Sequence, residues 1–369
     1  MAVVVAYAWG ERTMIGRSRV IVSSGLSPSA TVARRQPGHR QPGWGAWRTA
    51  ARAWPALGLA LLLLGGPGSV RGEQGLVLQE YPVAAGSHPH DAVPDRLGRV
   101  WYAAQGDGTV GRLDPATGDY VVVRPGPGSA PHGIIMGPDG AAWVTDGGLN
   151  AIVRVDADSM AVQVYPLPGA QAALNTLSFD GRGILWFTGQ AGYIGRLDPT
   201  TGVVQQFDAP RGRGPYGIAT APNGTVYYAS LAGSYLGRID GDDGSVTVLD
   251  PPTPQAGVRR VWPDSRGRLW VAEYNVGQVG RYDPATGEWA EWRLPGAGAR
   301  AYAIYVDDRD MVWLTDTGAD TVVRFDPNTE TFTTVAISRP SNVAQLGGNP
   351  GEVWGAQRAR DHVFVVRYE

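Results

Sequence analysis

The stretch AAWVTDGGLNAIVRVD (residues 141–156) holds the pattern that decides the fold of this 369-residue chain. In it, Trp143 is followed eleven residues later by an arginine and two residues after that by an aspartate. The aromatic position recurs seven times, about every 42 residues. The seven anchors are Trp101, Trp143, Trp186, Tyr227, Trp270, Trp313 and Trp354; the arginines are Arg112, Arg154, Arg196, Arg238, Arg281, Arg324 and Arg367; the aspartates of the first six units are Asp114, Asp156, Asp198, Asp240, Asp283 and Asp326. Self-similarity at this spacing is typical of propeller blades, so the sequence predicts an all-β, seven-bladed β-propeller.

Each repeat also shows the pattern of a four-stranded blade. The unit 131–168 contains four short segments of strand-like composition, separated by turn residues such as Pro138-Asp139-Gly140. The predicted strands of this unit are residues 133–137, 141–146, 151–156 and 162–167.

The two ends of the repeat array complement each other. Residues 76–83 resemble a fourth strand but precede the first anchor, and the last unit, 342–369, has only three strands. We therefore expect the N-terminal strand to pair with the last three strands and close the ring, since closure removes exposed sheet edges.

Composition excludes several classes of function. The chain has no cysteine, which excludes disulfides, thiol nucleophiles, thiolate metal sites and a lipoprotein anchor. All 32 basic residues are arginines, so a lysine Schiff base is excluded as well. The net charge of −2, with arginines spread one per blade, argues against nucleic-acid binding.

The sequence divides into an N-terminal extension, residues 1–72, and the propeller, residues 73–369. Residues 55–66 form a short apolar run after Arg48 and Arg52, and small residues follow it. This order is typical of a signal peptide, and the run is shorter than the ~20 residues that span a bilayer. We expect a secreted or extracytoplasmic protein; the alternative is anchorage through an uncleaved segment.

The repeated anchors, arginines and aspartates are expected to be packing and turn residues. Candidate functional positions are those that differ between blades at the predicted channel mouth, eleven residues before each anchor and three after it. The first set is His90, His132, Asn175, Tyr216, Arg259, Tyr302 and a residue near Asn342; the second is Ala104, Asp146, Gly189, Ser230, Glu273, Asp316 and Gln357. Residues equidistant from a hairpin turn face each other, so the two sets should be neighbours.

Several chemistries fit these positions. His90 and His132 occupy the same place in adjacent blades, and a carboxylate such as Asp146 would orient His132 and raise its pKa. Arg259 and Glu273 are expected either as a plain ion pair or as a clamp on a substrate carboxylate or carbonyl. The remaining candidates are Tyr216 and Tyr302, which would stack on a ring or fill the mouth, and the channel carboxylate Asp316.

Residues 76–369 resemble the streptogramin B lyase (virginiamycin B lyase) family. The phrases that carry the resemblance are Pro131-His132-Gly133-Ile134, Trp186-Phe187-Thr188, Ile194-Gly195-Arg196 and Gly280-Arg281. The family implies a seven-bladed propeller and a magnesium-dependent lyase that opens a cyclic depsipeptide antibiotic at its ester by elimination.

The resemblance also implies roles for individual residues. His90 matches a substrate-contacting histidine and His132 matches the proton acceptor, which removes a C–H proton while the ester carboxylate leaves. Asp146 falls where one glutamate holds the Mg²⁺ that polarises the ester carbonyl. Ala130 falls where the second metal-binding glutamate stands, so the chain departs from the family at half of its metal site.

Two other functions fit the residues. A lactonase-type metallohydrolase would use Glu273, Asn175 and either Asp146 or Asp316 around calcium. An exported binding or sensor propeller would need neither metal nor base. In each case we expect a monomer with a small-molecule or cyclic-peptide ligand and no nucleic-acid partner, and membrane contact only through the N-terminal segment.

Overall fold

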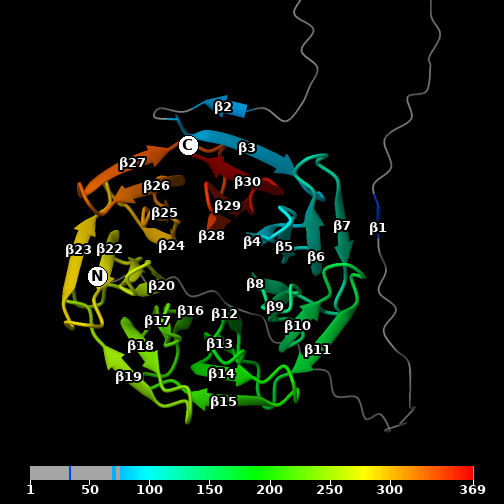
Figure 1. The fold of residues 1–369 in the computed structure, drawn as a ribbon, viewed down its shortest axis with the longest axis horizontal. Helices are drawn as coiled ribbons and strands as arrows, with labels where there is room; N and C mark the ends of the chain where they lie inside the picture. Colours follow the sequence, from blue (N-terminus) through cyan, green and yellow to red (C-terminus); the bar gives the residue numbers. More distant parts are fainter. Residues whose placement is uncertain (1–32, 35–68, 72–74, 369) are drawn as a thin grey trace, which may run out of the picture.

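Seven β-sheets surround a common axis in the computed structural model, which describes residues 33–34, 69–71 and 75–368 (Figure 1). Each blade has four antiparallel strands, and in the first six blades their numbers increase from the axis outward. This confirms the predicted seven-bladed β-propeller.

The first three blades use the strands β4–β7, β8–β11 and β12–β15 in chain order. Their bounds are β4 (Pro89–Pro94), β5 (Val100–Ala104), β6 (Thr109–Leu113), β7 (Tyr120–Val123), β8 (Pro131–Met136), β9 (Ala142–Asp146), β10 (Ala151–Val155), β11 (Val162–Pro166), β12 (Leu174–Phe179), β13 (Leu185–Gly189), β14 (Tyr193–Leu197) and β15 (Val204–Asp208). The four strands predicted in the unit 131–168 are thus confirmed, with ends shifted by one or two residues.

The next three blades repeat the same order. They consist of β16 (Pro215–Thr220), β17 (Val226–Ser230), β18 (Tyr235–Ile239), β19 (Val246–Leu249), β20 (Val258–Pro263), β21 (Leu269–Glu273), β22 (Gln278–Tyr282), β23 (Trp289–Arg293), β24 (Ala301–Val306), β25 (Val312–Asp316), β26 (Thr321–Asp326) and β27 (Thr331–Val335).

The seventh blade joins the two ends of the propeller. Its inner strands are β28 (Val343–Asn349), β29 (Glu352–Gln357) and β30 (His362–Arg367), and its outer strand is β3 (Val77–Pro82). β3 pairs with β30 from Val77↔Arg367 to Pro82↔His362. Tyr81 from β3 is 2% exposed and stacks on the Trp354 ring at 5.9 Å. The predicted closure of the ring is confirmed.

Two short strands precede the ring in sequence. β1 (Ala33–Arg34) pairs with β7, and β2 (Ser69–Arg71) pairs with β3. The predicted apolar leader at 55–66 lies outside the described residues. Within the residues that the structure covers, no helix has the length and apolar character needed to cross a membrane.

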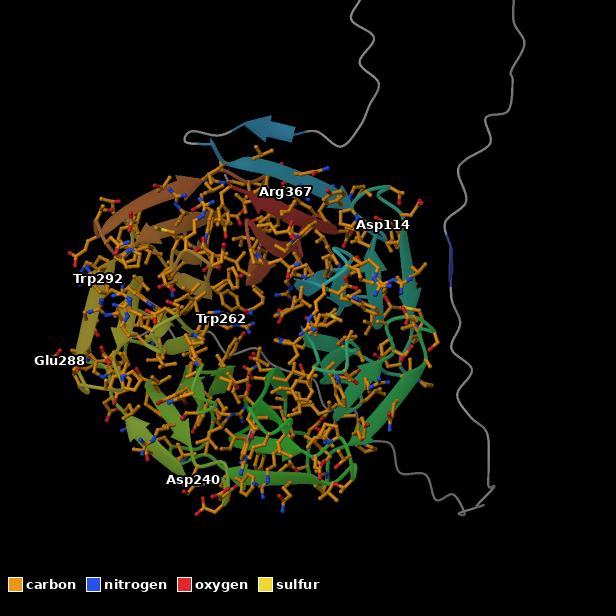
Figure 2. The ribbon with its side chains drawn as sticks, viewed as in Figure 1. Asp114, Asp240, Trp262, Glu288, Trp292 and Arg367 are labelled. Carbon is orange, nitrogen blue, oxygen red and sulfur yellow. The ribbon has the colours of Figure 1, made fainter. Side chains whose placement is uncertain are left out.

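The repeated side chains form the packing framework that the sequence predicts. The six anchor tryptophans are buried between sheets. In blade 5, the Trp270 indole donates to Asp264 Oδ2 at 3.0 Å and the Arg281 guanidinium lies 5.7 Å from the ring centroid. The repeated aspartates cap turns, as where Asp114 Oδ1 accepts the Ala116 N–H at 2.9 Å. Figure 2 shows Asp114 and Asp240 at the outer edge of the ring.

A β-bulge interrupts the innermost hairpin of every blade. In blade 2, Pro131 pairs with Asp146 and the next pair is Ile134↔Val144, so the bulge holds His132 and the residue after it. The prediction that His132 lies directly opposite Asp146 is therefore wrong by one residue, because the extra bulge residue shifts the register. In blade 7 the residue equivalent to His132 is Ala344, whereas the sequence pointed to a residue near Asn342, which is exposed.

Candidate functional site

The bulges bring side chains from different blades together on the ring axis. Several of their contacts join blades that are not neighbours: Arg260 of β20 reaches β4 and β12, and Tyr216 of β16 reaches β24. We call this cluster the ring centre. It consists of His90, Asp91, His132, Asn175, Thr176, Tyr216, Arg259, Arg260 and Tyr302.

His90 and His132 are direct neighbours in the ring centre. Their ring centroids are 3.8 Å apart with an interplanar angle of 36°. His90 is 2% exposed and His132 is 9% exposed. The two histidines, which the sequence places at the same position of adjacent blades, are thus in contact in the structure, and their chemical roles stay predictions.

Hydrogen bonds select the tautomer of both rings. His90 Nδ1 lies 2.7 Å from Asp91 Oδ1, and His132 Nδ1 lies 3.2 Å from the backbone oxygen of Asn175. Because a carboxylate or carbonyl oxygen accepts, each Nδ1 carries the proton and donates. Each Nε2 therefore keeps its lone pair, which is the form a general base requires.

The surroundings keep both imidazoles neutral. Burial lowers the pKa of His90 well below its ordinary value, and the charges of Arg358, Arg260 and Arg259 lower it further. Burial also lowers the pKa of His132 well below its ordinary value, with His90 adding to the effect and Asp91 opposing it. The expected net rise of the His132 pKa beside Asp146 is wrong: Asp91 is the carboxylate that acts to raise this pKa, and desolvation outweighs its attraction.

Asp146 does not orient His132. Its carboxylate is fully buried and accepts from Ser129 Oγ at 2.5 Å, from the Ala130 N–H at 2.8 Å and from the Leu149 N–H at 3.0 Å. These bonds hold the two loops beside β9 and use both carboxylate oxygens, whereas His132 Nδ1 bonds the Asn175 backbone oxygen.

Asp316 occupies the same register position in blade 6 and likewise accepts hydrogen bonds from the backbone of the adjacent loops. Its Oδ1 accepts the N–H groups of Arg300 at 2.8 Å and Gly318 at 2.9 Å. Two of the predicted channel carboxylates are therefore loop caps in the structure.

Asp91 and Arg260 form a buried ion pair that the sequence reasoning missed. Arg260 Nη2 lies 3.8 Å from Asp91 Oδ1, and both side chains are 2% exposed. Arg260 Nη1 also donates to Thr176 Oγ1 at 3.3 Å. Burial raises the pKa of Asp91, while the Arg260 charge opposes that shift. The sequence held a hint of this pair, since Asp91 directly follows the candidate His90 and Arg260 directly follows the candidate Arg259. Only a bulge, however, turns two consecutive side chains to the same face of a strand.

Tyr216, Arg259 and Tyr302 come together, as their shared register predicts. Arg259 Nη2 donates to Tyr216 Oη at 2.8 Å, and the two phenol oxygens of Tyr216 and Tyr302 are 2.7 Å apart. The Arg259 guanidinium lies 3.5 Å from the Tyr302 centroid and 4.5 Å from the Tyr274 centroid. Cation–π contacts thus replace the ion pair with Glu273 that the sequence suggested.

Glu273 lies inside blade 5 among polar residues of the neighbouring strands. Its Oε2 accepts from Gln278 Nε2 at 3.1 Å, and its Oε1 is buried without a hydrogen-bond partner. Burial raises the pKa of Glu273 to about 8, and the nearby Glu291 charge adds to the shift. The side chain therefore belongs to the blade interior, and Arg259 is not its partner.

The ring centre does not fit the magnesium site of the family. Across residues 75–368, no three carboxylates or histidines converge on one point. Ala130 has no oxygen ligand in its side chain, and the Asp146 oxygens are already taken by three donors. A divalent cation prefers several free oxygen ligands, which these residues do not offer.

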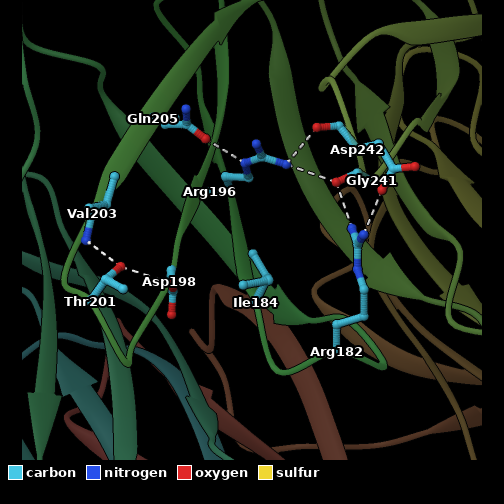
Figure 3. Close-up of a pocket in the computed structure, with 9 residues that line it drawn as sticks. All are labelled: Arg182, Ile184, Arg196, Asp198, Thr201, Val203, Gln205, Gly241 and Asp242. Carbon is cyan, nitrogen blue, oxygen red and sulfur yellow. Dashed lines mark hydrogen bonds and ion pairs between the residues drawn. The ribbon is translucent and has the colours of Figure 1, made fainter.

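Two surface pockets lie away from this chemistry. They measure about 540 and 600 Å³ and lie at the outer part of blades 3 and 4. Figure 3 shows Arg182 and Arg196 in one of them, both bonded to the turn at Gly241 and Asp242. These bonds connect one blade to the next, so the arginines there are structural.

Comparison with known proteins shows which family this chain resembles. Residues 69–243 match the model of the virginiamycin B lyase family. The predicted family resemblance is confirmed. No curated protein matches the chain.

Solved lyase structures have the same fold. A streptogramin B lyase structure aligns with a TM-score of 0.74 and 22% identity, covering 80% of this chain and 98% of that one. Virginiamycin B lyase from Staphylococcus aureus aligns with a TM-score of 0.74 and 21% identity over 80% of this chain and 100% of its own. A catalytically inactive variant of that enzyme with quinupristin aligns with a TM-score of 0.74 and 22% identity, over 80% of this chain and 100% of its own. At this identity the likeness shows the fold, and function must be argued from the ring centre.

Proposed function

We propose that this virginiamycin B lyase-like propeller is a carbon–oxygen lyase that opens an ester or lactone by elimination at the ring centre. The observation that carries the proposal is the buried pair of neutral imidazoles, His90 and His132, each with its Nδ1 proton donated to a fixed oxygen. A buried neutral imidazole with a free Nε2 lone pair is suited to remove a proton from carbon.

The reaction follows from these positions. His132 Nε2 takes the proton from the carbon next to the C–O bond, and the C–H electron pair forms a C=C bond. The C–O bond breaks, and its electrons leave with the ester oxygen as a carboxylate. Arg260 and Arg259 supply positive charge where that carboxylate develops. His90, held by Asp91, packs against His132 and fixes the plane of the base.

Product mass tests the proposal. The full chain is incubated with a streptogramin B macrocycle, with magnesium in one arm and a chelator in the other, and products are read by chromatography and mass spectrometry. Elimination gives a linear product of unchanged mass, whereas hydrolysis adds one water and would support the lactonase alternative. His132→Ala should remove the product, and His362→Ala, a histidine outside the ring centre, should not. The chelator arm tests directly whether a metal takes part.

A non-catalytic binding propeller is the second candidate, and one observation favours it. Hydrogen bonds join Arg259, Tyr216 and Tyr302 within the ring centre, and His132 is only 9% exposed. An aromatic and cationic cluster of this kind suits binding of a small ligand. Tight binding without any new product in the same assay would decide for this function.

A further inference from the structure

The ring centre contains buried donors that make no hydrogen bond to the protein, although one of them, Arg260 Nη2, lies 3.8 Å from Asp91 Oδ1 in the ion pair. They are Asn175 Nδ2, Arg259 Nε, Arg260 Nε and Arg260 Nη2. Asn175 is fully buried, and Arg260 is 2% exposed. Buried polar groups in folded proteins are nearly always paired, and unpaired ones are costly, most of all on a charged group. Donors left open together in this way indicate an acceptor that binds among them.

Short links place these donors beside the candidate base. Arg260 Nη1 donates to Thr176 Oγ1 at 3.3 Å, and Thr176 Oγ1 donates to Asn175 Oδ1 at 2.9 Å. The backbone oxygen of Asn175 in turn lies 3.2 Å from His132 Nδ1. The open donors of Asn175 and Arg260 therefore belong to the same cluster as the imidazole pair.

The charge of this region favours an anion. Arg259, Arg260 and Arg358 act on the imidazole of His90, and Asp91 is the carboxylate that faces them in the cluster. The same positive charge acts on Tyr216. Burial by itself would raise the pKa of its phenol, but the charges of Arg259 and Arg260 outweigh burial and lower this pKa. One carboxylate against three guanidinium groups leaves net positive charge in a desolvated place.

Blade 4 is shaped to admit the Arg260 side chain. A Cβ added at Gly217 would lie 2.7 Å from Arg260 Cα and 3.1 Å from Arg260 Cδ. Any larger residue at this position would therefore displace Arg260.

We propose that the ring centre is a carboxylate-binding site in which Arg260, Arg259 and Asn175 donate to the ligand next to His132. The planar guanidinium matches the two oxygens of a carboxylate. The carboxylate has two possible sources, a free carboxyl group carried by the substrate and the leaving carboxylate of the elimination. The assignment of a reacting substrate rests on the proposed function, whereas the anion site itself does not.

Equilibrium binding tests the site without catalysis. Benzoate and its neutral isostere benzamide are titrated into the full chain by calorimetry at pH 7. We expect benzoate to bind at least ~10-fold more tightly than benzamide, because a hydrogen bond to a charged group is worth about one order of magnitude in affinity. Arg260→Gln and Arg259→Gln should each weaken benzoate by ~10-fold or more. Arg266→Gln, the same substitution at an exposed turn of blade 5, should leave binding unchanged.

Three results would overturn the site. They are equal affinity for benzoate and benzamide, absence of benzoate binding to the unmodified chain at millimolar concentration, and unchanged affinity in folded Arg260→Gln and Arg259→Gln. Arg260→Gln leaves Asp91 buried without its ion-pair partner and is therefore at risk of unfolding. If circular dichroism shows that it does not fold, Arg259→Gln alone decides.

The activity assay separates this inference from the proposed function. Benzoate binding that persists in His132→Ala, with no elimination by any variant, keeps the anion site and rejects the lyase. Elimination that benzoate does not inhibit rejects the anion site and keeps the lyase. A substrate-borne carboxylate predicts that an ester with a free acid group reacts with at least ~10-fold higher kcat/KM than its amide. A leaving-group site predicts equal kcat/KM for both and competitive inhibition by benzoate.

Discussion

The outer framework and the ring centre of this propeller use the same strands in opposite ways. In the framework, the same tryptophan, arginine and aspartate recur, and their polar atoms find partners, as with Trp270 and Asp264. In the ring centre no two blades carry the same set, and Arg260 and Asn175 keep unpaired buried donors. In the repeated part, within residues 75–368, the indole of Trp354 is the one anchor nitrogen that is buried without a partner, whereas in the ring centre the unpaired donors lie on the residues that differ between blades.

The seventh blade shows how the framework depends on its partners. In four blades an aspartate six residues before the anchor accepts the indole N–H, but in blade 7 this position is Gly348. The Trp354 indole nitrogen is accordingly buried without a partner. The framework tolerates this loss because Trp354 still packs against Tyr81 and under Arg367.

Removing the closing strand would break the framework as a whole and should have the largest effect. A chain that starts at residue 83 lacks β3, which leaves the edge of β30 and its apolar side chains exposed. We expect it to aggregate or to lose its cooperative thermal transition, whereas a chain that starts at residue 69 should melt in one step. Circular dichroism and size-exclusion chromatography measure both, and a well-folded chain without β3 would contradict the closure argument.

Substituting the base would break the ring centre and leave the framework intact. His132→Ala should lower kcat by ~10²–10⁴-fold, the usual contribution of a general base. KM and the thermal midpoint should change little, because the imidazole hydrogen-bonds only one backbone oxygen. Steady-state kinetics on the substrate found by the mass assay, with His362→Ala as the matched control, give the comparison. An equal loss in both variants would show that histidine 132 has no special role.

The pH dependence of activity sharpens the same contrast. A base works in its deprotonated form, and the pKa of His132 is lowered by burial and by His90. Activity should therefore stay level as the pH falls through about 6.5, the ordinary histidine value, and decline only at lower pH. A profile of kcat/KM against pH measures this, and an acidic limb centred at or above 6.5 would contradict the buried neutral pair.

The buried carboxyl of Glu273 should make the free energy of unfolding depend on pH. Its folded pKa of about 8 lies above the unfolded value, so the folded state holds a proton that the unfolded state releases between those two values. The free energy of unfolding should consequently fall as the pH rises from about 4.5 to 8. Glu273→Gln should remove this slope and stabilise the protein by about 4 kcal/mol at pH 8. Urea unfolding at pH 5 and 8 measures it, with the exposed Glu288→Gln as control.

The smallest expected effect is a difference in stability loss between substitutions at two anchor tryptophans of the framework. Trp270→Phe loses the indole bond to Asp264, whereas Trp354→Phe loses none. We expect Trp270→Phe to cost about 1 kcal/mol more in free energy of unfolding, the net value of one hydrogen bond. Chemical denaturation of both variants gives the difference, and equal losses would mean that the indole bond contributes nothing.

The sequence alone determined the fold and the blade to which each candidate residue belongs. The tryptophan spacing predicted seven blades, and the odd strand before the first anchor predicted the closure by β3, because both follow from local patterning and from the need to pair every sheet edge. It also placed His90 and His132 at the same position of adjacent blades, and the structure shows that their rings are in contact there.

Only the tertiary structure decided which side chains face one another. The bulge moved Asp146 one residue away from His132 and turned Asp91 and Arg260 inward, a shift that hairpin counting cannot detect. The contacts of Arg260 with β4 and β12 depend on blades far apart in sequence. Likewise, desolvation set the pKa of His132 below its ordinary value, and burial of this kind is a property of the closed ring rather than of any neighbouring residue.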